Sequence, residues 1–294
     1  MTSLPAVHAD DEWSPLRAVI VGRAGRSCFP SASKRMIEAT MPSEHAHRFQ
    51  PKSPFPENLT AKAEAELDRF AAILEKEGVK VYRPTDIDWL ARASRGSVAH
   101  ERSSSDTPIL DELAHDPRVR VVRRPEYAFA DTLDDNEGKW AINNSRPAFD
   151  TADFMRFGRT LIDQYSHVTN QAGVDYVRQH LPPGYTIEML DVNDPHAMHI
   201  DATILPLREG LLVYHPHKVT EEALRRHTVL AEWDLRAYPF TPEGRDEPPL
   251  YMTSPWLCLN ALVLDGKRVV VEAGDERTAG WFEELGMECI RCPF

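Results

Sequence analysis

The sequence has few cysteines, no long hydrophobic run and no excess of basic residues. Its 294 residues include four cysteines, Cys28, Cys258, Cys289 and Cys292, which are too few to predict a disulfide scaffold. Cys289 and Cys292 form a CxxC pair without a second pair or a nearby histidine, so we predict no zinc site. No segment approaches the roughly 20 apolar residues of a membrane-spanning helix, and the first residues lack the pattern of a signal peptide.

The charge balance is acidic, with 34 Lys+Arg against 46 Asp+Glu and a formal net charge of −12. A nucleic-acid partner is therefore not expected, because phosphate binding needs a basic face. An acidic protein is compatible with a cationic small-molecule substrate. Together with the absence of targeting and membrane signals, these features predict a cytoplasmic protein that does not bind membranes.

The C-terminal region predicts the order strand, strand, helix, strand. Two apolar runs, Leu257–Leu264 and Lys267–Ala273, are separated by an Asp-Gly pair typical of a hairpin. A helix over Asp275–Leu285 is expected to end at Gly286, since glycine favours the position after a helix. The strand Met287–Cys292 completes this ββαβ unit.

The same order recurs upstream, which predicts an internally repeated α/β fold in a single domain over residues 1–294. A long region, residues 91–140, contains one expected helix and one expected strand but no hairpin. We interpret it as a shortened second unit, with an ordinary surface insertion as the alternative. The other expected elements are the strands Ala18–Val21, Val79–Tyr82, Asp153–Arg156, Thr160–Gln164, Thr186–Leu190, Ala202–Leu207, Leu211–Tyr214 and Leu235–Phe240, with the helices Thr60–Glu77, Asn170–Leu181 and Thr220–Leu230.

Two segments, residues 149–154 and 198–203, concentrate polar groups at the entries to successive units. If the units surround an axis, Asp150 and His199 meet there, and a carboxylate beside a histidine forms a general acid–base pair. Asp201 alternates with His199 along an expected strand and is suited to hold a cation such as guanidinium. The alternative is that Asp150 and Asp153 are turn or cap residues and that His199 is only hydrogen-bonded.

Two weaker candidates lie at the edges of later units, Lys218 after a strand of the His199 unit and Thr253-Ser254 before the last unit. Lys218 is suited to bind a carboxylate, although an ordinary surface lysine is the alternative. Thr253 and Ser254 are suited to donate hydroxyl hydrogen bonds to a ligand, and a Ser/Thr turn is the alternative.

The sequence resembles the arginine amidinotransferase family, which includes the glycine and inosamine-phosphate amidinotransferases. The resemblance lies in FDTADFMRFGR at residues 149–159, SHVTN at 166–170 and AMHIDAT at 197–203, and it extends over residues 12–90 and about 120–294. It implies the pentein fold, an α/β propeller of pseudo-symmetric ββαβ units, here with a shortened second unit.

The resemblance also implies a reaction. L-Arginine donates its amidino group to an enzyme cysteine and leaves as ornithine, and an acceptor amine such as glycine or an aminocyclitol then takes the group. No cofactor or metal is implied, and a homodimer is expected. The implied roles are acid–base for His199 with Asp150, guanidinium binding for Asp201, pocket lining for Met198, carboxylate binding for Lys218, and substrate hydrogen bonding for Thr253 and Ser254.

Two features depart from the family pattern. A Pro-Arg-Asp element that contacts the guanidinium in the family does not occur between Trp89 and Trp140. The family nucleophile lies in a His-Cys segment after the last strand, and we expect this segment to be missing here. We therefore assign no catalytic cysteine, and we expect the chain as written to be inactive. The alternatives are an inactive homologue that binds arginine or serves as a partner subunit, and a hydrolase that uses water as the acceptor.

Overall fold

The computed structural model describes residues 9–25, 27, 54–84, 122, 138–241 and 258–293. In this part of the chain the strands form four separate small sheets, one of two strands and three of three strands. The α/β class predicted from the repeats is therefore confirmed. The propeller of ββαβ units implied by the resemblance stays a prediction, as does the single domain. The helix and strand expected within residues 91–140 lie in a region of which the structure describes only residues 122 and 138–140.

The three-stranded sheets share one pattern, an antiparallel pair followed by a helix and a parallel return strand. This is the order that the sequence predicts. The units consist of β3 (Phe154–Phe157), β4 (Thr160–Asp163), α7 (Gln171–His180) and β5 (Thr186–Met189); β6 (Ile204–Arg208), β7 (Leu211–Tyr214), α8 (Glu221–Arg225) and β8 (Asp234–Ala237); and β9 (Leu262–Val263), β10 (Arg268–Glu272), α9 (Glu276–Glu284) and β11 (Glu288–Cys292).

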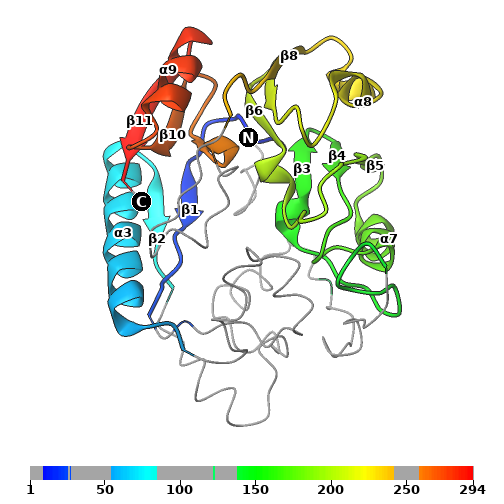
Figure 1. The fold of residues 1–294 in the computed structure, drawn as a ribbon, viewed down its shortest axis with the longest axis horizontal. Helices are drawn as coiled ribbons and strands as arrows, with labels where there is room; N and C mark the ends of the chain where they lie inside the picture. Colours follow the sequence, from blue (N-terminus) through cyan, green and yellow to red (C-terminus); the bar gives the residue numbers. More distant parts are fainter. Residues whose placement is uncertain are drawn as a thin grey trace, which may run out of the picture.

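The N-terminal unit is the looser copy that the sequence predicts. Strands β1 (Ala18–Ile20) and β2 (Lys80–Tyr82) are parallel, and the helix α3 (Glu57–Lys76) lies between them in the chain. Figure 1 shows that α3, α9, α8 and α7 follow one another along the outside of an arc, with the strands on the inner side. Equivalent ends of successive sheets therefore face a shared interior, where residues distant in sequence can meet.

Local side chains explain most helix boundaries. Asn170 and Asp275 accept hydrogen bonds from the backbone nitrogens of Gly173 and Thr278, which satisfies the otherwise unpaired first turns of α7 and α9. Gly286 follows α9 with a φ of 86°, a conformation that glycine adopts without strain. These boundaries agree with the sequence predictions to within one residue.

Two predicted elements are shorter than expected by more than half their length. The helix predicted over Thr220–Leu230 ends at Arg225, and the chain continues into the 3₁₀ turn η4 (Thr228–Leu230). Buried His227 starts this turn, and its Nδ1 lies 2.9 Å from Oε2 of Glu188 on β5. A contact with the neighbouring sheet therefore replaces the last helical turn.

Of the strand predicted over Leu257–Leu264, which the structure describes from residue 258, only Leu262 and Val263 are in a strand. Fully buried Leu259 accepts a hydrogen bond from the backbone nitrogen of Ala261, so the chain turns before the strand begins. The predicted hairpin to β10 is present, but its loop is set by Asp265, whose side chain accepts from the backbone nitrogens of Lys267 and Arg268. The apolar run reflects burial in the core here rather than a long strand.

The segment before β1 connects three units. Glu12 accepts hydrogen bonds from Nε and Nη2 of Arg156 on β3, at 2.7 and 3.0 Å. The Trp13 ring lies 5.1 Å from that of Trp233, which precedes β8, and the Leu16 nitrogen donates to the Leu264 carbonyl after β9. This segment therefore fixes the relative positions of the sheets that carry the candidate site.

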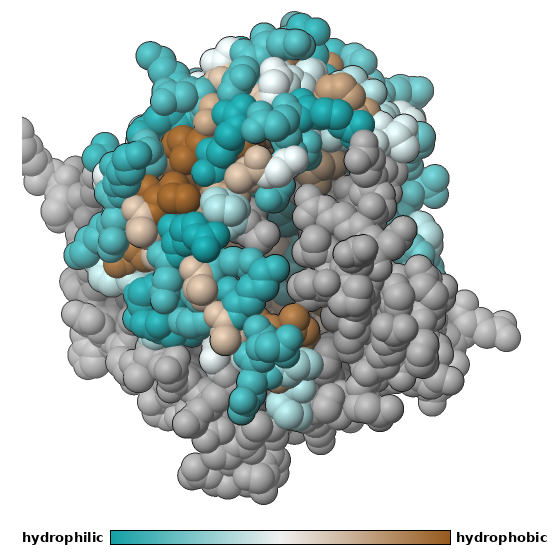
Figure 2. All heavy atoms as spheres, turned by 60° about the vertical axis from the view of Figure 1, so that its left-hand side comes forward, coloured by the Kyte–Doolittle hydropathy of each residue, from teal (hydrophilic) through white to brown (hydrophobic). Residues whose placement is uncertain are grey.

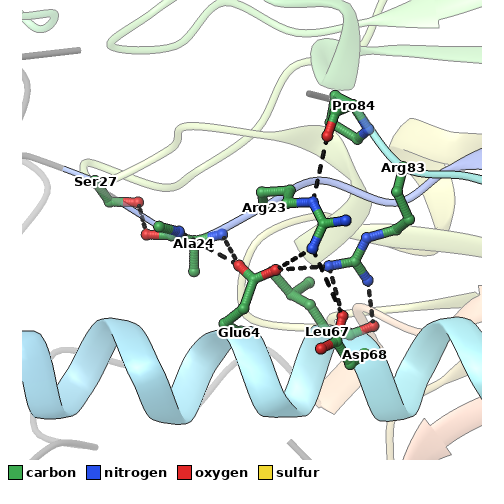
Figure 3. Close-up of polar contacts among 9 residues, drawn as sticks. Arg23, Ala24, Ser27, Glu64, Leu67, Asp68, Arg83 and Pro84 are labelled. Atoms are coloured by element: carbon green, nitrogen blue, oxygen red, sulfur yellow. Dashed lines mark hydrogen bonds and ion pairs between the residues drawn. The ribbon is translucent and has the colours of Figure 1, made fainter. Parts of the chain in front are cut away.

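A cluster of charged residues holds the ends of β1 and β2 on α3 (Figure 3). Glu64 of α3 accepts hydrogen bonds from Arg23 and Arg83 at 2.8 and 2.9 Å and from the backbone nitrogen of Ala24 at 2.7 Å. Asp68, one turn further along the helix, lies 2.9 Å from Arg83. These hydrogen bonds and ion pairs orient both arginines and the loop that follows β1.

The outer surface shows little apolar area where residues are described. The face in Figure 2 is mainly hydrophilic, with a few separate hydrophobic spots. Among the described residues, the exposed large hydrophobic side chains are Ile20 and Tyr82. None of the described helices is both long enough and apolar enough to span a bilayer.

Candidate active site

Asp150 begins the 3₁₀ turn η2 (Thr151–Asp153), directly before β3. Its Oδ1 accepts a hydrogen bond of 3.0 Å from the backbone nitrogen of Ala152, as expected for a cap residue. The other carboxylate oxygen, Oδ2, lies 3.5 Å from Nε2 of His199. One oxygen of Asp150 therefore caps the turn while the other faces the histidine, so the cap position leaves room for a role beside His199.

His199 begins the 3₁₀ turn η3 (Ile200–Ala202), directly before β6. The turns η2 and η3 pack against each other, which brings together residues 49 positions apart in the sequence. The prediction that His199 and Asp201 share one face of a strand is wrong, because both precede β6 and Asp201 lies within η3. The close packing of the two turns, rather than strand alternation, places these groups near each other.

The Asp150–His199 pair favours its charged form. The hydrogen bond with Asp150 and its negative charge raise the pKa of His199 against the opposing effect of burial. The same interaction lowers the pKa of Asp150. At neutral pH the arrangement therefore favours an imidazolium that can donate a proton beside an ionised carboxylate.

Asp201 presents a carboxylate that is only partly satisfied. Its Oδ2 accepts a hydrogen bond of 3.3 Å from Nδ2 of Asn260, whereas its buried Oδ1 has no hydrogen-bond partner among the described residues. Burial raises the pKa of Asp201, and the charges of His199 and Lys218 act in the opposite direction. A buried carboxylate oxygen without a donor is suited to a cationic ligand.

Lys218 follows β7, and its Nζ forms an ion pair of 2.9 Å with Oδ2 of Asp194. Both side chains are largely buried, with exposed fractions of 14% and 12%. Lys218 is therefore not an ordinary surface lysine, and its charge also acts on Asp201. Met198 is half-buried beside His199. Thr253 and Ser254 lie outside the described residues.

The loop over residues 166–170 supports both halves of the site, a role that sequence reasoning missed. The Thr169 hydroxyl accepts the backbone N–H of Asp150 at 3.0 Å. The backbone nitrogen of His167 donates to the Ala197 carbonyl at 2.9 Å, and its Nε2 lies 2.7 Å from the Pro195 carbonyl. The SHVTN match was the only signal of this loop, and it carried no indication of the contacts.

An open pocket of about 490 Å³ lies beside the two turns, a size suited to a small molecule, although neither Asp150 nor His199 is among its lining residues. Thr151 and Ala152 of η2 and Ile200 and Asp201 of η3 contribute to its lining. Much of the remaining wall is apolar. It consists of Glu12, Phe149, Phe154, Met155, Arg156, Leu161 and Val177.

The described residues include no group of three or more His, Cys, Asp or Glu side chains placed to hold a metal ion. Burial raises the thiol pKa of Cys258 and Cys292, and raises that of Cys289 to about 11. Since the thiolate is the nucleophilic form, these three thiols are disfavoured as nucleophiles. Cys28 lies outside the described residues.

Comparisons with known proteins place the chain in a family. No protein-family model matches the chain. Glycine amidinotransferase, mitochondrial, from Gallus gallus is 32% identical over 329 residues, covering 96% of this chain and 76% of that protein. L-arginine:L-lysine amidinotransferase from Pseudomonas savastanoi pv. phaseolicola is 32% identical over 323 residues, covering 96% of this chain and 88% of the relative.

A solved structure agrees with these relatives. SxtG, an amidinotransferase of the saxitoxin biosynthetic pathway of Microseira wollei, superimposes with a TM-score of 0.81 at 27% identity, covering 98% of this chain and 92% of that one. The similarity thus spans nearly the whole chain in both sequence and fold. The chain belongs to the amidinotransferase family of the pentein superfamily.

Proposed function

We propose that this chain binds L-arginine at the η2–η3 junction and takes part in the transfer of its amidino group to an acceptor amine. The observation that carries the proposal is the Asp150–His199 pair beside Asp201, whose buried Oδ1 has no partner in the described residues. A guanidinium supplies several N–H donors in one plane, which suits such an oxygen.

The proposed chemistry assigns His199 two opposite proton transfers. In the first half, a cysteine thiolate attacks the central guanidinium carbon, and the C–N bond to ornithine breaks as His199 donates its proton to the leaving nitrogen. In the second half, neutral His199 takes a proton from the attacking acceptor amine, and the bond from carbon to sulfur breaks. Asp150 stabilises the imidazolium that is present before the first transfer and restored by the second.

We assign the thiol to none of Cys258, Cys289 and Cys292, because burial raises the pKa of each. An arginine-binding homologue without its own nucleophile is therefore kept as the second candidate function. The proposed acceptor is glycine or an aminocyclitol-type amine, and the protein is proposed to act as a cytoplasmic homodimer without a cofactor.

The binding step is tested by calorimetric titration with L-arginine. We expect the substitution Asp201→Asn to weaken arginine binding at least tenfold, because it removes the charge that pairs with the guanidinium. Asp191→Asn makes the same chemical change at an exposed position and serves as the matched control. Equal affinities of the D201N and D191N proteins would contradict the proposal.

The chemical step is tested by product analysis with L-arginine and a panel of amines. Ornithine together with a guanidino derivative of the amine supports transfer, and citrulline would support hydrolysis instead. Arginine binding without turnover would favour the non-catalytic homologue. Light scattering in the same buffer tests the proposed dimer.

A further inference from the structure

A second carboxylate lies beneath the Asp150–His199 pair. Asp153 ends η2, and it is fully buried, as are Gln164, Ser166 and Thr169, which follow β4. None of these four residues is assigned a role in the proposed chemistry. Their polar side chains nevertheless converge on one point below the candidate site.

Three donors converge on the carboxylate of Asp153. Gln164 Nε2 donates to Oδ1 at 2.9 Å, and Ser166 Oγ donates to Oδ2 at 2.7 Å. Thr169 Oγ1 also donates to Oδ2. Hydrogen bonds from three donors favour the ionised form, because a protonated carboxyl group would lose an acceptor position.

The backbone fixes the direction of both hydroxyl groups. Ser166 Oγ accepts the backbone N–H groups of Val168 and Thr169, and Thr169 Oγ1 accepts the N–H of Asp150 at 3.0 Å. A backbone nitrogen can only donate, so each hydroxyl hydrogen is left to point at Asp153. A chain of hydrogen bonds therefore runs from Asp153 through Thr169 to the backbone of Asp150.

We propose that Asp153 is a positioning residue of this site, which acts through the Thr169 hydroxyl on Asp150 and through its charge on His199. The Thr169 hydroxyl holds the backbone of Asp150, and the backbone nitrogen of Ala152 donates to its Oδ1. These two contacts leave Oδ2 directed to His199. The catalytic meaning of this arrangement rests on the proposed function. Measuring the pKa of His199 in protein without arginine tests the positioning role independently of the proposed function.

The charges around Asp153 support this role. His199 lowers the pKa of Asp153 and Asp153 raises that of His199, although burial is the larger effect on Asp153 and brings its pKa to about 6. Asp150 and Asp201 are the other carboxylates whose charges act on His199, and Asp163 on β4 feels the charge of Asp153. Asp163 has its own pKa raised to about 8 by burial and by Asp153, so it is largely neutral at pH 7.

Three substitutions separate these contributions. Asp153→Asn keeps the shape but removes the charge, and its amide nitrogen competes for the hydroxyl lone pairs. Thr169→Val keeps the charge and removes the hydroxyl that links Asp153 to Asp150. Asp163→Asn is the matched control, because it makes the same change at an adjacent buried carboxyl group that is already neutral.

The readout is the pKa of the His199 imidazole, measured by nuclear magnetic resonance on protein labelled with nitrogen-15 histidine. The His199 signal is identified because it is absent from the spectrum of the H199Q protein. We expect the His199 pKa to fall by about half a unit to one unit in D153N, by the effect of one nearby charge. We also expect a fall in T169V and an unchanged titration in D163N. A group with only a structural role would leave this titration unchanged.

The opposite results are equally specific. A folded D153N protein whose His199 titrates as in the wild type would overturn the proposal, as would an equal shift in D163N. An unchanged titration in T169V would overturn the hydrogen-bond relay. If the D153N protein does not fold, T169V and D163N decide the question.

Discussion

Asp163 is a buried carboxyl group whose ionisation should lower the stability of the protein. It is fully buried at the end of β4, and its Oδ1 accepts the backbone nitrogen of Gln164 at 2.7 Å. Its Oδ2 has no hydrogen-bond partner among the described residues. Burial and the neighbouring charge of Asp153 raise its pKa from 3.8 to about 8. Asp163→Asn preserves the accepting oxygen and removes the group that must ionise.

The sign of the effect follows from the direction of the shift. A carboxyl group whose pKa is higher in the folded state binds more protons there, so stability falls as pH rises between the unfolded and folded values. For Asp163 this window runs from 3.8 to about 8. One pKa unit corresponds to about 1.4 kcal/mol. The raised pKa of Asp163 therefore lowers the free energy of unfolding at pH 7 by about 4 kcal/mol if the surroundings do not relax. Relaxation around the charge reduces this, so we expect a gain of about 2 to 4 kcal/mol for D163N at pH 8.

The assay is urea unfolding of the wild-type and D163N proteins at pH 4, 6 and 8. We expect nearly equal stability at pH 4 and an advantage for D163N that grows with pH. Exposed Asp191→Asn controls for the loss of a charge as such. A difference that stays constant with pH, or a D163N protein that is less stable at pH 8, would refute the reasoning about this buried group.

Two further predictions concern α7, α9 and Lys218. Gly173→Ala in α7 should destabilise the protein by about 1–3 kcal/mol, because a Cβ there would overlap the Ala148 carbonyl. Gly280→Ala in α9 should stabilise the protein by about 0.5–1 kcal/mol, because a Cβ there meets no atom within 4 Å and alanine favours the helix. Chemical unfolding of both proteins measures this, and equal effects would contradict the packing argument. Asp194→Asn should release Lys218 from its ion pair and strengthen L-arginine binding several-fold relative to agmatine, which lacks the carboxylate. Calorimetry measures both ligands, and an equal change for the two would show that Lys218 does not face the carboxylate.

The amino-acid sequence by itself determined the features that depend on neighbouring residues. Helices α7 and α9 lie within one residue of the ranges predicted over Asn170–Leu181 and Asp275–Leu285, and Gly286 follows α9 as predicted. Caps and turns act within one or two turns of the chain, so their signals are local. The repeated ββαβ order and the family resemblance were likewise visible from short patterns and their order.

Only the tertiary structure decided the features that depend on contacts between distant segments. The contact of His227 with Glu188 ends α8 early, and the packing of η2 against η3 brings Asp150 within 3.5 Å of His199. The burial of Asp153 beneath them was likewise hidden in the sequence, where it read as one more polar turn residue. A carboxylate acquires its altered pKa and its role from the groups that surround it in space, and for Asp150 and Asp153 these include His199 of the next unit.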